Sequence, residues 1–489
     1  EEEKRIAEKD DARVVGEGQK YLQLYLADAS SGKVNKLTEG VFSVFGFSWS
    51  PDGKTIVFDR APEAGLDGFY KTDIWLVNVA DRKMRPLVER PGLDRLPRFS
   101  PDGKWVAFAS AGGVAHWLVE HELHVVSVNG SESRKLTSAY DRTADGYEWS
   151  ADSTALWFEG PWNTTSQLFR VNADGTGFTN ITNVEGVISD VDLHGARAAY
   201  IYQSTTEPPE LFVDKKQLTH HNDAYRDREL GATRVIRWKN PQDGLEIEGL
   251  LTLPVGYKGG RVPLLTFVHG GPASRFDQGY LGYLGFLYAP QALAAHGYAV
   301  LRPNPRGTGG YGLAFRTANR ADWAGMDWID INAGIDKVIA DGIADPDRLG
   351  LMGWSYGGFI ASWALGHSDR FRAVSVGAPV VDLLSFHGTT DIRAFIPAYF
   401  AEMNLDALRA RSPLWHLKKT NARVLVQHGD ADDRVPLSQG IMLYRRLEEL
   451  GADVKMVVYP RTPHIPREPK LRMDVARRNV ELFLGTIAR

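Results

Sequence analysis

The chain has 489 residues, well above the roughly 150 of a typical domain, so we expect at least two hydrophobic cores. Hydrophobic residues make up 43% and charged residues 24%, a composition that is typical of globular proteins and excludes a disordered or fibrous chain. The net charge of −4 does not indicate a nucleic-acid or membrane-surface partner, and the absence of cysteine excludes disulfides, thiolate metal sites and a cysteine nucleophile.

No uninterrupted apolar run approaches the roughly 18 to 20 residues that cross a bilayer, so we predict no membrane span. The chain starts with Glu1-Glu2-Glu3-Lys4, without an initiating Met and without the basic and apolar segments of a secretory signal. We therefore expect a processed, truncated or engineered start. The sequence leaves a cytoplasmic, periplasmic or secreted location open.

The first half of the chain repeats a turn followed by a strand. The segment 49–54 (WSPDGK) recurs at 99–104 (FSPDGK) and, weakened, at 149–154 (WSADST), an interval of 50 residues. The copies have the Pro and Asp-Gly chemistry of turns, and each precedes a β-prone run such as 55–58 (TIVF). We interpret the copies as structural turns rather than ligand sites, because Asp-Gly is common in turns.

A second pattern lies between these copies. It is an alternating segment, such as 73–77 (DIWLV), followed by a turn and a Leu-Thr or Leu-Val ending. Four short strands in each repeat of about 40 to 50 residues are typical of a β-propeller blade. The sequence therefore predicts a β-propeller over residues 1–228, with about four blades and a partial one. Because residues 21–38 resemble only the outer half of a blade, we expect that some N-terminal blades are absent.

From about residue 229 the pattern changes, and β-prone runs alternate with segments of helical periodicity. This alternation predicts a doubly wound, mostly parallel sheet covered by helices over residues 229–489. The expected strands are a hairpin of 234–238 with 245–253, followed by 264–268, 298–301, 349–352, 373–376, 424–427 and 454–459. Apolar spacing of i, i+3, i+4 predicts helices at 324–340, 359–365, 437–450 and 471–488.

The segment 353–357 (GWSYG) lies between the strand expected to end at Met352 and the helix expected to start near Gly358. A nucleophile elbow needs small residues two positions before and after its serine, because the tight turn brings the strand and the helix close together. The pentapeptide alone is a weak signal, but its placement between strand and helix is the one that this mechanism requires. We therefore predict that Ser355 is a nucleophile.

A serine hydroxyl needs a base that takes its proton and a carboxylate that orients this base. Two loops after later strands supply candidates: 428–436 (HGDADDRVP) and 460–464 (PRTPH). The order Ser, Asp, His along the chain is the order in α/β-hydrolases. His464 is the candidate base, and the residues alone leave three candidate acids, namely Asp430, Asp432 and Asp433.

These motifs together resemble the prolyl oligopeptidase family of serine peptidases, particularly its acylaminoacyl-peptidase and dipeptidyl-aminopeptidase-like branch. The matching segments are 269–272 (HGGP), 303–307 (PNPRG), 353–358 (GWSYGG) and the loops with Asp432 and His464. The resemblance covers nearly all of 230–489, and the predicted propeller matches the gating domain of the family. It implies an α/β-hydrolase catalytic domain in which Asp432 is the catalytic acid.

The resemblance also implies an oxyanion hole made by the backbone N–H groups of Tyr356 and Gly271. A plain Gly-Pro turn is the alternative interpretation of Gly271. His269 stands where other members place a tyrosine hydroxyl, so we include it among the substrate-binding candidates and expect the oxyanion to be bound by main chain.

Two further substrate-binding candidates follow from the resemblance. Arg434 stands where prolyl oligopeptidase-like members use an arginine to hold a substrate carbonyl, and a guanidinium is a fork of donors suited to that task. Its alternative is a surface ion pair with Asp433. Tyr399 lies in an aromatic segment that corresponds to the pocket for the residue before the cleaved bond, and core packing is its alternative. Asn304 and Arg306 are expected to brace the site rather than to react.

The predicted function is a serine peptidase that cleaves short peptides through an acyl-enzyme, releasing N-terminal (acyl)aminoacyl or dipeptidyl units. It needs no metal and no cofactor, and the propeller would exclude folded proteins as it does in the family. An esterase that uses the same triad is one alternative, and a propeller binding protein with an inert hydrolase domain is another. The sequence leaves open the length of the released unit, the preferred residue before the cut and whether the chain forms a homo-oligomer.

Overall fold

The structure is a computed structural model that describes residues 2–12, 14, 18–130, 132–144, 146–195, 197–282, 285–401 and 403–487. The chain divides into two compact units. The first unit comprises Glu1–Ala115 and Val125–Ser133, and the second comprises His116–His124 and Arg134–Arg489. The predicted domain boundary after residue 228 and the predicted number of blades stay predictions.

The first unit contains short antiparallel strands of the N-terminal propeller. A helix and a two-stranded sheet come first, and the four-stranded sheet β3-β4-β5-β6 follows. The elements are α1 (Glu2–Glu8), β1 (Tyr25–Ala27), β2 (Val34–Lys36), β3 (Phe47–Trp49), β4 (Thr55–Arg60), η1 (Leu66–Lys71), β5 (Asp73–Asn78), β6 (Met84–Val88), β7 (Asp94–Phe99) and β8 (Trp105–Ser110). The strand β9 (Glu122–Ser127) continues from one unit into the other.

The repeated turns have a shared local cause. The hydroxyl of Ser50 donates to Asp52 Oδ1 at 2.7 Å, and the N–H of Lys54 donates to the same oxygen at 3.1 Å. The second and third copies repeat the Ser-Asp contact, at 2.6 Å and 2.7 Å. The strands β4, β8 and β12 (Ala155–Trp162) start directly after these turns, which confirms the predicted order of turn and strand.

The second unit begins with further propeller strands. They are β10 (Arg134–Lys135), β11 (Tyr147–Trp149), β12 (Ala155–Trp162), β13 (Thr165–Asn172), β14 (Thr179–Asn180), β15 (Val187–His194), β16 (Arg197–Gln203), β17 (Glu210–Val213) and β18 (Lys216–Gln217), followed by η2 (Asp223–Tyr225). The neighbours β11-β12-β13-β14 and β15-β16-β17-β18 are antiparallel. A single parallel residue pair, Ser166 with Val187, joins the two sets.

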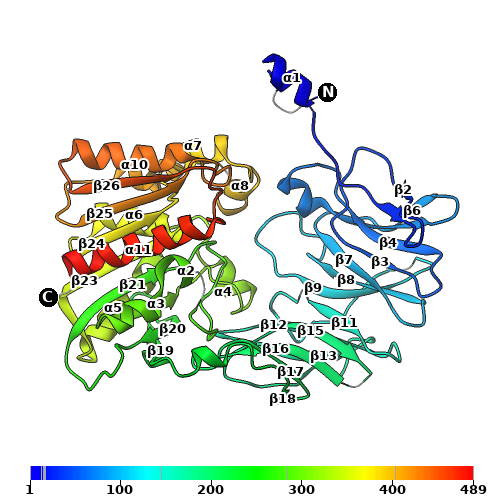
Figure 1. The fold of residues 1–489 in the computed structure, drawn as a ribbon, viewed down its shortest axis with the longest axis horizontal. Helices are drawn as coiled ribbons and strands as arrows, with labels where there is room; N and C mark the ends of the chain where they lie inside the picture. Colours follow the sequence, from blue (N-terminus) through cyan, green and yellow to red (C-terminus); the bar gives the residue numbers. More distant parts are fainter. Residues whose placement is uncertain are drawn as a thin grey trace. The chain divides into compact units, whose positions relative to one another are not determined.

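The remainder of the second unit is built on an eight-stranded sheet with the order β19-β20-β22-β21-β23-β24-β25-β26 (Figure 1). Its strands are β19 (Thr233–Lys239), β20 (Glu246–Thr252), β21 (Val262–Val268), β22 (Ala299–Asn304), β23 (Ala344–Trp354), β24 (Phe371–Gly377), β25 (Arg423–Gly429) and β26 (Val454–Tyr459). The pairs of β19 with β20 and of β20 with β22 are antiparallel, and all others are parallel. The predicted hairpin and all six predicted strands are present.

Helices cover both faces of this sheet, because successive strand residues point to opposite sides. In β21, Leu264 belongs to the buried cluster that contains residues of α5, α6 and α10, whereas Leu265 belongs to the cluster that contains residues of α2, α3 and α11. The helices are α2 (Gly285–Tyr288), α3 (Pro290–Ala295), α4 (Leu313–Thr317), α5 (Met326–Ala340), α6 (Tyr356–His367), α7 (Leu383–Thr389), α8 (Phe395–Tyr399), α9 (Leu405–Ala410), η3 (Pro413–Trp415), α10 (Leu437–Glu449) and α11 (Pro469–Thr486).

The predicted fold class is confirmed: an N-terminal β-propeller and a C-terminal α/β-hydrolase domain. Of the predicted helices, 437–450 corresponds to α10 (Leu437–Glu449) and 324–340 to α5 (Met326–Ala340). The predicted helix 471–488 corresponds to α11 (Pro469–Thr486), and its last residue, Ala488, lies outside the described residues. Within the described part of the chain, no helix has the length and apolar character that a bilayer crossing requires.

Candidate active site

Ser355 stands at the junction of β23 and α6, where the chain reverses sharply. Its backbone has φ 61° and ψ −120°, a region that glycine adopts freely and that strains other residues by roughly 1–3 kcal/mol. The turn is held on both sides, because the N–H of Ser355 donates to the carbonyl of Gly377 at 2.9 Å and its carbonyl accepts from the N–H of Phe359 at 2.9 Å.

The glycines around Ser355 have a steric reason. A Cβ placed on Gly353 would lie 2.4 Å from the carbonyl atoms of Gly357, and one placed on Gly357 would lie 2.1 Å from the carbonyl oxygen of Val268. Contacts this short do not occur between real atoms, so side chains at either position would push the strand and the helix apart. The elbow geometry that the sequence motif predicted is present in the structure.

Asp432 and His464 meet although they lie 32 positions apart in the sequence. The carboxylate oxygen Oδ2 of Asp432 accepts a hydrogen bond from Nδ1 of His464 at 2.8 Å. Asp432 lies after β25, and His464 lies after the neighbouring strand β26. A neutral imidazole with its proton on Nδ1 has a bare Nε2, which can accept the proton of a hydroxyl group.

The surroundings of Asp432 favour the charged carboxylate. Its oxygen Oδ1 accepts the backbone N–H groups of Arg434 at 3.0 Å and Val435 at 2.9 Å. Burial by itself would raise the pKa of Asp432, but hydrogen bonds from His428 and His464 and from the backbone hold this pKa well below its ordinary value. The competing acids Asp430 and Asp433 are exposed, and of the three candidate acids it is Asp432 that is hydrogen-bonded to the imidazole of His464.

His464 is also tied to the elbow. The indole Nε1 of Trp354 donates to the carbonyl oxygen of His464 at 2.8 Å, so the loop with the base is anchored to the residue before Ser355. The hydroxyl of Ser355 makes no hydrogen bond to a residue that the structure describes. In an unliganded site such bonds are often long and close only around a substrate.

Two backbone N–H groups are available at the predicted oxyanion hole. Tyr356 is the first residue of α6 and Gly271 lies in the loop after β21, and within the described part of the chain neither N–H has an acceptor. Free N–H groups at a helix start suit a developing negative charge. The loop with Gly271 comes close to the elbow, since a Cβ on its neighbour Gly270 would lie 3.4 Å from Ser355 Cβ.

His269 lies in the interior below this loop. The side chain is 1% exposed. Its Nδ1 lies 2.8 Å from the carbonyl oxygen of Gly270, and its Nε2 lies 3.0 Å from the hydroxyl of Thr308. Burial lowers the pKa of His269 to about 4, so the ring is neutral. These contacts hold His269 against the loop that contains Gly271, and a substrate contact of His269 stays a prediction.

Arg434 makes an ion pair, but with a partner other than the expected one. Its Nε and Nη2 donate to the two carboxylate oxygens of Asp391 at 2.6 Å and 3.3 Å, and not to Asp433. The segment with Asp391 also contacts the backbone of the acid loop, because its N–H donates to the carbonyl of Asp433 at 3.0 Å. A substrate contact of Arg434 stays a prediction.

Tyr399 belongs to an aromatic cluster in the core. Its side chain is 2% exposed, and its ring lies 4.9 Å from Trp323 and 5.1 Å from Phe395. Tyr399 is therefore packed in the core, and a role in lining the substrate pocket stays a prediction.

Asn304 and Arg306 are both held by hydrogen bonds in the interior, and their role as braces of the site stays a prediction. Asn304 Oδ1 accepts the N–H of Phe276 and its Nδ2 donates to the carbonyl of the same residue, both at 2.8 Å. Arg306 is bound by two carboxylates, Asp330 at 2.8 Å and Asp243 at 2.7 Å. The amide pair of Asn304 fixes the segment that continues from Gly271.

Sequence reasoning did not find Arg275, which ties this same segment to the propeller strands of the second unit. Its Nη1 donates to the carbonyls of Asn163 at 2.9 Å and Thr165 at 2.6 Å, and its Nη2 donates to the hydroxyl of Ser166 at 2.6 Å. The partners lie more than a hundred positions away in the sequence, and no local motif signals such a pairing.

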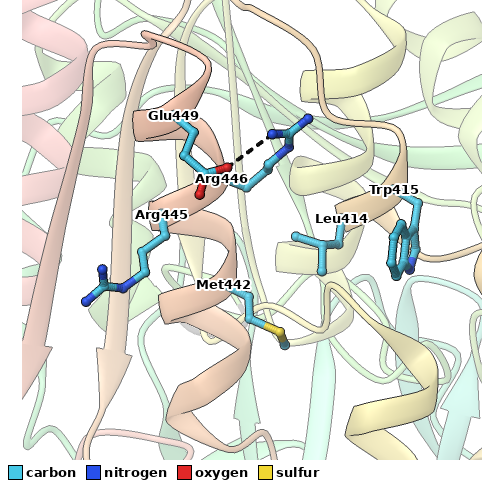
Figure 2. A pocket seen from close by; sticks show the side chains of 6 residues that line it. All are labelled: Leu414, Trp415, Met442, Arg445, Arg446 and Glu449. Carbon is cyan, nitrogen blue, oxygen red and sulfur yellow. Dashed lines mark hydrogen bonds and ion pairs between the residues drawn. The ribbon is translucent and has the colours of Figure 1, made fainter.

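A separate groove lies between η3 and α10 on the hydrolase domain (Figure 2). It contains none of the residues that the sequence assigned to catalysis. The lining residues are Leu414, Trp415, Met442, Arg445, Arg446 and Glu449. We therefore locate the candidate active site at the elbow and not in this groove.

A serine on a strained turn between a parallel strand and a helix, with an Asp-His pair on the loops after two neighbouring strands, defines the class of α/β-hydrolases with a serine nucleophile. The family model described as the prolyl oligopeptidase family matches residues 285–488. Residues 285–488 are thus similar to the catalytic part of this family of serine peptidases.

Relatives are similar over most of this chain. An uncharacterized peptidase of Bacillus subtilis, YuxL, is 28% identical over 94% of this chain and 85% of its own length. Dipeptidyl-peptidase 5 of Porphyromonas gingivalis is 26% identical over 87% of this chain. The chain spans only 64% of the length of that dipeptidyl-peptidase.

Solved structures share the fold. An acylaminoacyl peptidase of Pyrococcus horikoshii has a TM-score of 0.78 at 21% identity, covering 96% of this chain and 86% of that one. A puromycin hydrolase has a TM-score of 0.74 at 20% identity, covering 94% of this chain and 72% of that one. At these identities the likeness concerns the arrangement of strands and helices, not the substrate.

Proposed function

We propose that the chain is a serine peptidase that removes short N-terminal units, acylaminoacyl or dipeptidyl, from short peptides through an acyl-enzyme. The observation that carries this proposal is the hydrogen bond of 2.8 Å between Asp432 and His464 beside the strained turn at Ser355. The names of the relatives, a dipeptidyl-peptidase and an acylaminoacyl peptidase, support the kind of unit released.

The first half of the reaction forms the ester. Ser355 Oγ attacks the carbonyl carbon of the scissile peptide bond while Nε2 of His464 takes the hydroxyl proton. The carbonyl oxygen becomes an oxyanion and accepts from the N–H groups of Tyr356 and Gly271, and Asp432 stabilises the imidazolium. The carbon–nitrogen bond then breaks, and His464 gives its proton to the leaving amine, so that the shortened peptide departs with a free N-terminus.

The second half releases the N-terminal unit. A water molecule attacks the ester carbon and gives one proton to His464. The oxyanion forms again on the same two N–H groups, and the bond from the carbon to Ser355 Oγ breaks. His464 returns the proton to that oxygen, which restores the enzyme and frees the carboxylic acid of the released unit.

The test uses one peptide sequence with a free and with an acetylated N-terminus, and the products are identified by mass spectrometry. We expect cleavage after one or two residues by the wild type and none by Ser355→Ala. The matched control is Ser368→Ala at the other end of α6, which should cleave like the wild type. Equal cleavage by wild type and Ser355→Ala would refute the proposal. Hydrolysis of small esters without any peptide cleavage would support the esterase instead.

A further inference from the structure

Asp327 is a buried carboxyl group that the proposed mechanism does not use. It lies in the first turn of α5 and is 0% exposed. Its Oδ2 accepts the hydrogen bond of the Tyr356 hydroxyl, and its Oδ1 accepts the N–H of Trp328 at 2.7 Å. Because Tyr356 directly follows Ser355, this contact connects α5 to the elbow.

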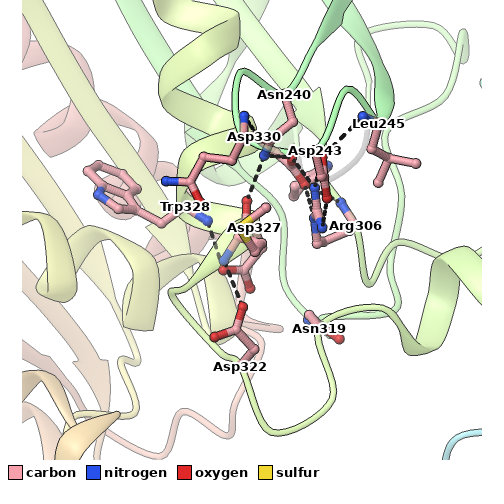
Figure 3. Close-up of polar contacts among 12 residues, drawn as sticks. Asn240, Asp243, Leu245, Arg306, Asn319, Asp322, Asp327, Trp328 and Asp330 are labelled. Atoms are coloured by element: carbon pink, nitrogen blue, oxygen red, sulfur yellow. Dashed lines mark hydrogen bonds and ion pairs between the residues drawn. The ribbon is translucent and has the colours of Figure 1, made fainter.

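Three acids lie together near the start of α5 (Figure 3). Asp330 receives three hydrogen bonds from Arg306, at 2.8 to 3.0 Å, and Asp322 is paired with Arg411. Asp327, in contrast, has no cationic partner among the residues that the structure describes. Burial, with a smaller contribution from the two neighbouring acids, raises the pKa of Asp327 to about 7.

The side chain of Tyr356 has contacts at its ring and at its hydroxyl group. Trp323 meets it edge-on at a centroid distance of 5.0 Å, and Phe359 stacks on it at 5.4 Å. Asp327 binds the hydroxyl at the far end of the ring. A side chain fixed at its faces and at its tip also fixes its own Cα, and with it the direction of the backbone N–H at the start of α6.

We propose that Asp327 is a positioning residue that aims the backbone N–H of Tyr356 at the oxyanion by holding the hydroxyl of the same residue. This inference rests on the proposed function, which assigns that N–H to the oxyanion hole. Loss of one oxyanion donor costs about 10²–10³-fold in kcat, so a donor that is only misdirected should cost about tenfold to a hundredfold.

The test compares variants on both sides of the contact. Tyr356→Phe removes only the hydroxyl and retains the backbone N–H, and Asp327→Leu removes the acceptor. We expect each to lower kcat by about tenfold to a hundredfold with KM within about twofold of the wild type. Asp327→Asn keeps an amide that can bond to the hydroxyl, so its kcat should stay within about threefold. Asp336→Asn, on the same helix and paired with Arg370, is the matched control and should behave like the wild type.

The double variant separates positioning from general damage. If Asp327 acts through the hydroxyl, Asp327→Leu in the Tyr356→Phe background lowers kcat little further, whereas independent effects would multiply. Affinity for a peptide aldehyde, whose adduct carries the oxyanion, should fall in parallel with kcat. Multiplying effects, or a wild-type kcat in Tyr356→Phe, would overturn the proposal.

A second readout does not depend on the peptide substrate. The rate of labelling of Ser355 by a fluorophosphonate also requires the oxyanion donors, and we expect the same order: wild type and Asp336→Asn fast, Tyr356→Phe and Asp327→Leu slow. A labelled wild type that cleaves no peptide would refute the peptidase proposal and still decide the role of Asp327 by the labelling rates. A wild type that is not labelled would refute both.

Discussion

The substitution Asp432→Asn tests the proposed triad with almost no change in shape. In the structure, Oδ1 of Asp432 already accepts two backbone N–H groups, from Arg434 and Val435. Those two donors would hold the amide oxygen of the asparagine at this place. The NH₂ group would then face Nδ1 of His464 across the contact of 2.8 Å.

This orientation forces the wrong tautomer on the base. An NH₂ group can only donate, so Nδ1 of His464 must accept and the ring proton must move to Nε2. A protonated Nε2 cannot take the hydroxyl proton of Ser355. The same substitution in another serine peptidase triad lowers kcat about 10⁴-fold, which corresponds to about 5 kcal/mol of activation free energy, and we expect a loss of this size here.

The measurement is kcat and KM on a cleaved peptide, with Asp430→Asn as the matched control in the same loop. Asp430 is exposed, so its variant should keep the activity of the wild type. We expect KM of Asp432→Asn to change little, because the substitution lies behind the imidazole and away from the substrate. A loss of less than about tenfold in kcat would refute the triad assignment, since the wrong tautomer should cost about 10⁴-fold.

Gly357, Glu159 and Arg434 each give one further prediction. Gly357→Ala places a Cβ 2.1 Å from the Val268 carbonyl oxygen, so it should lower Tm and activity together by overpacking worth about 1–3 kcal/mol. The control is Gly388→Ala, whose Cβ would have no atom within 4 Å and which should lower neither. Burial and the neighbouring Asp190 raise the pKa of Glu159 to about 7, so the folded protein favours the protonated carboxyl group. The free energy of unfolding of the wild type should therefore fall as the pH rises from the pKa of the unfolded chain through about 7. The Tm of Glu159→Gln relative to wild type should therefore increase from pH 5 to pH 8, and a constant difference would contradict this. If the guanidinium of Arg434 holds a substrate carbonyl, Arg434→Gln should raise KM about tenfold or more with kcat nearly unchanged. An unchanged KM would contradict the substrate contact and leave Arg434 with only its ion pair with Asp391.

The strands of the hydrolase domain could be predicted because their signal is local. Buried parallel strands are short continuous apolar runs, and the predicted segment 454–459 corresponds to β26 (Val454–Tyr459). The short helices α7 and α9 were not predicted. They have seven and six residues, fewer than two full turns beyond their caps, so apolar spacing has no second period in which to appear.

The residues of the candidate site also divide into those that the sequence predicts and those that it does not. Local motifs predict the serine and the candidate base, because the glycines of the elbow and the position of a loop after a strand are visible in the sequence. The partners of the supporting side chains cannot be predicted in this way. Asp391 pairs with Arg434 across 43 positions, and Asp327 pairs with Tyr356 across 29. Such pairs form only when the sheet order brings β23, α5 and the loop after β25 together, and the chain gives no local sign of that order.

Asp432 and Asp327 show how the same side chain can serve one site in two charge states. Both are buried, and burial alone raises the pKa of each. Asp432 gains enough donors to stay an anion, and the proposed mechanism needs this charge because the imidazolium of His464 would form beside it. Asp327 receives a phenol and a single N–H and no cation from the described residues, so its proton is retained up to about pH 7.

The difference has an electrostatic consequence at the elbow. In the proposed mechanism the N–H of Tyr356 stabilises a developing negative charge. A second fixed anion behind the same residue would oppose that charge in a medium of low dielectric constant. A neutral carboxyl at position 327 can still accept and donate hydrogen bonds, so it holds the hydroxyl of Tyr356 without adding this repulsion. Conversely, a neutral Asp432 would leave the imidazolium without its counter-charge. The donors around each acid, rather than its depth in the protein, therefore decide which of the two tasks it can perform.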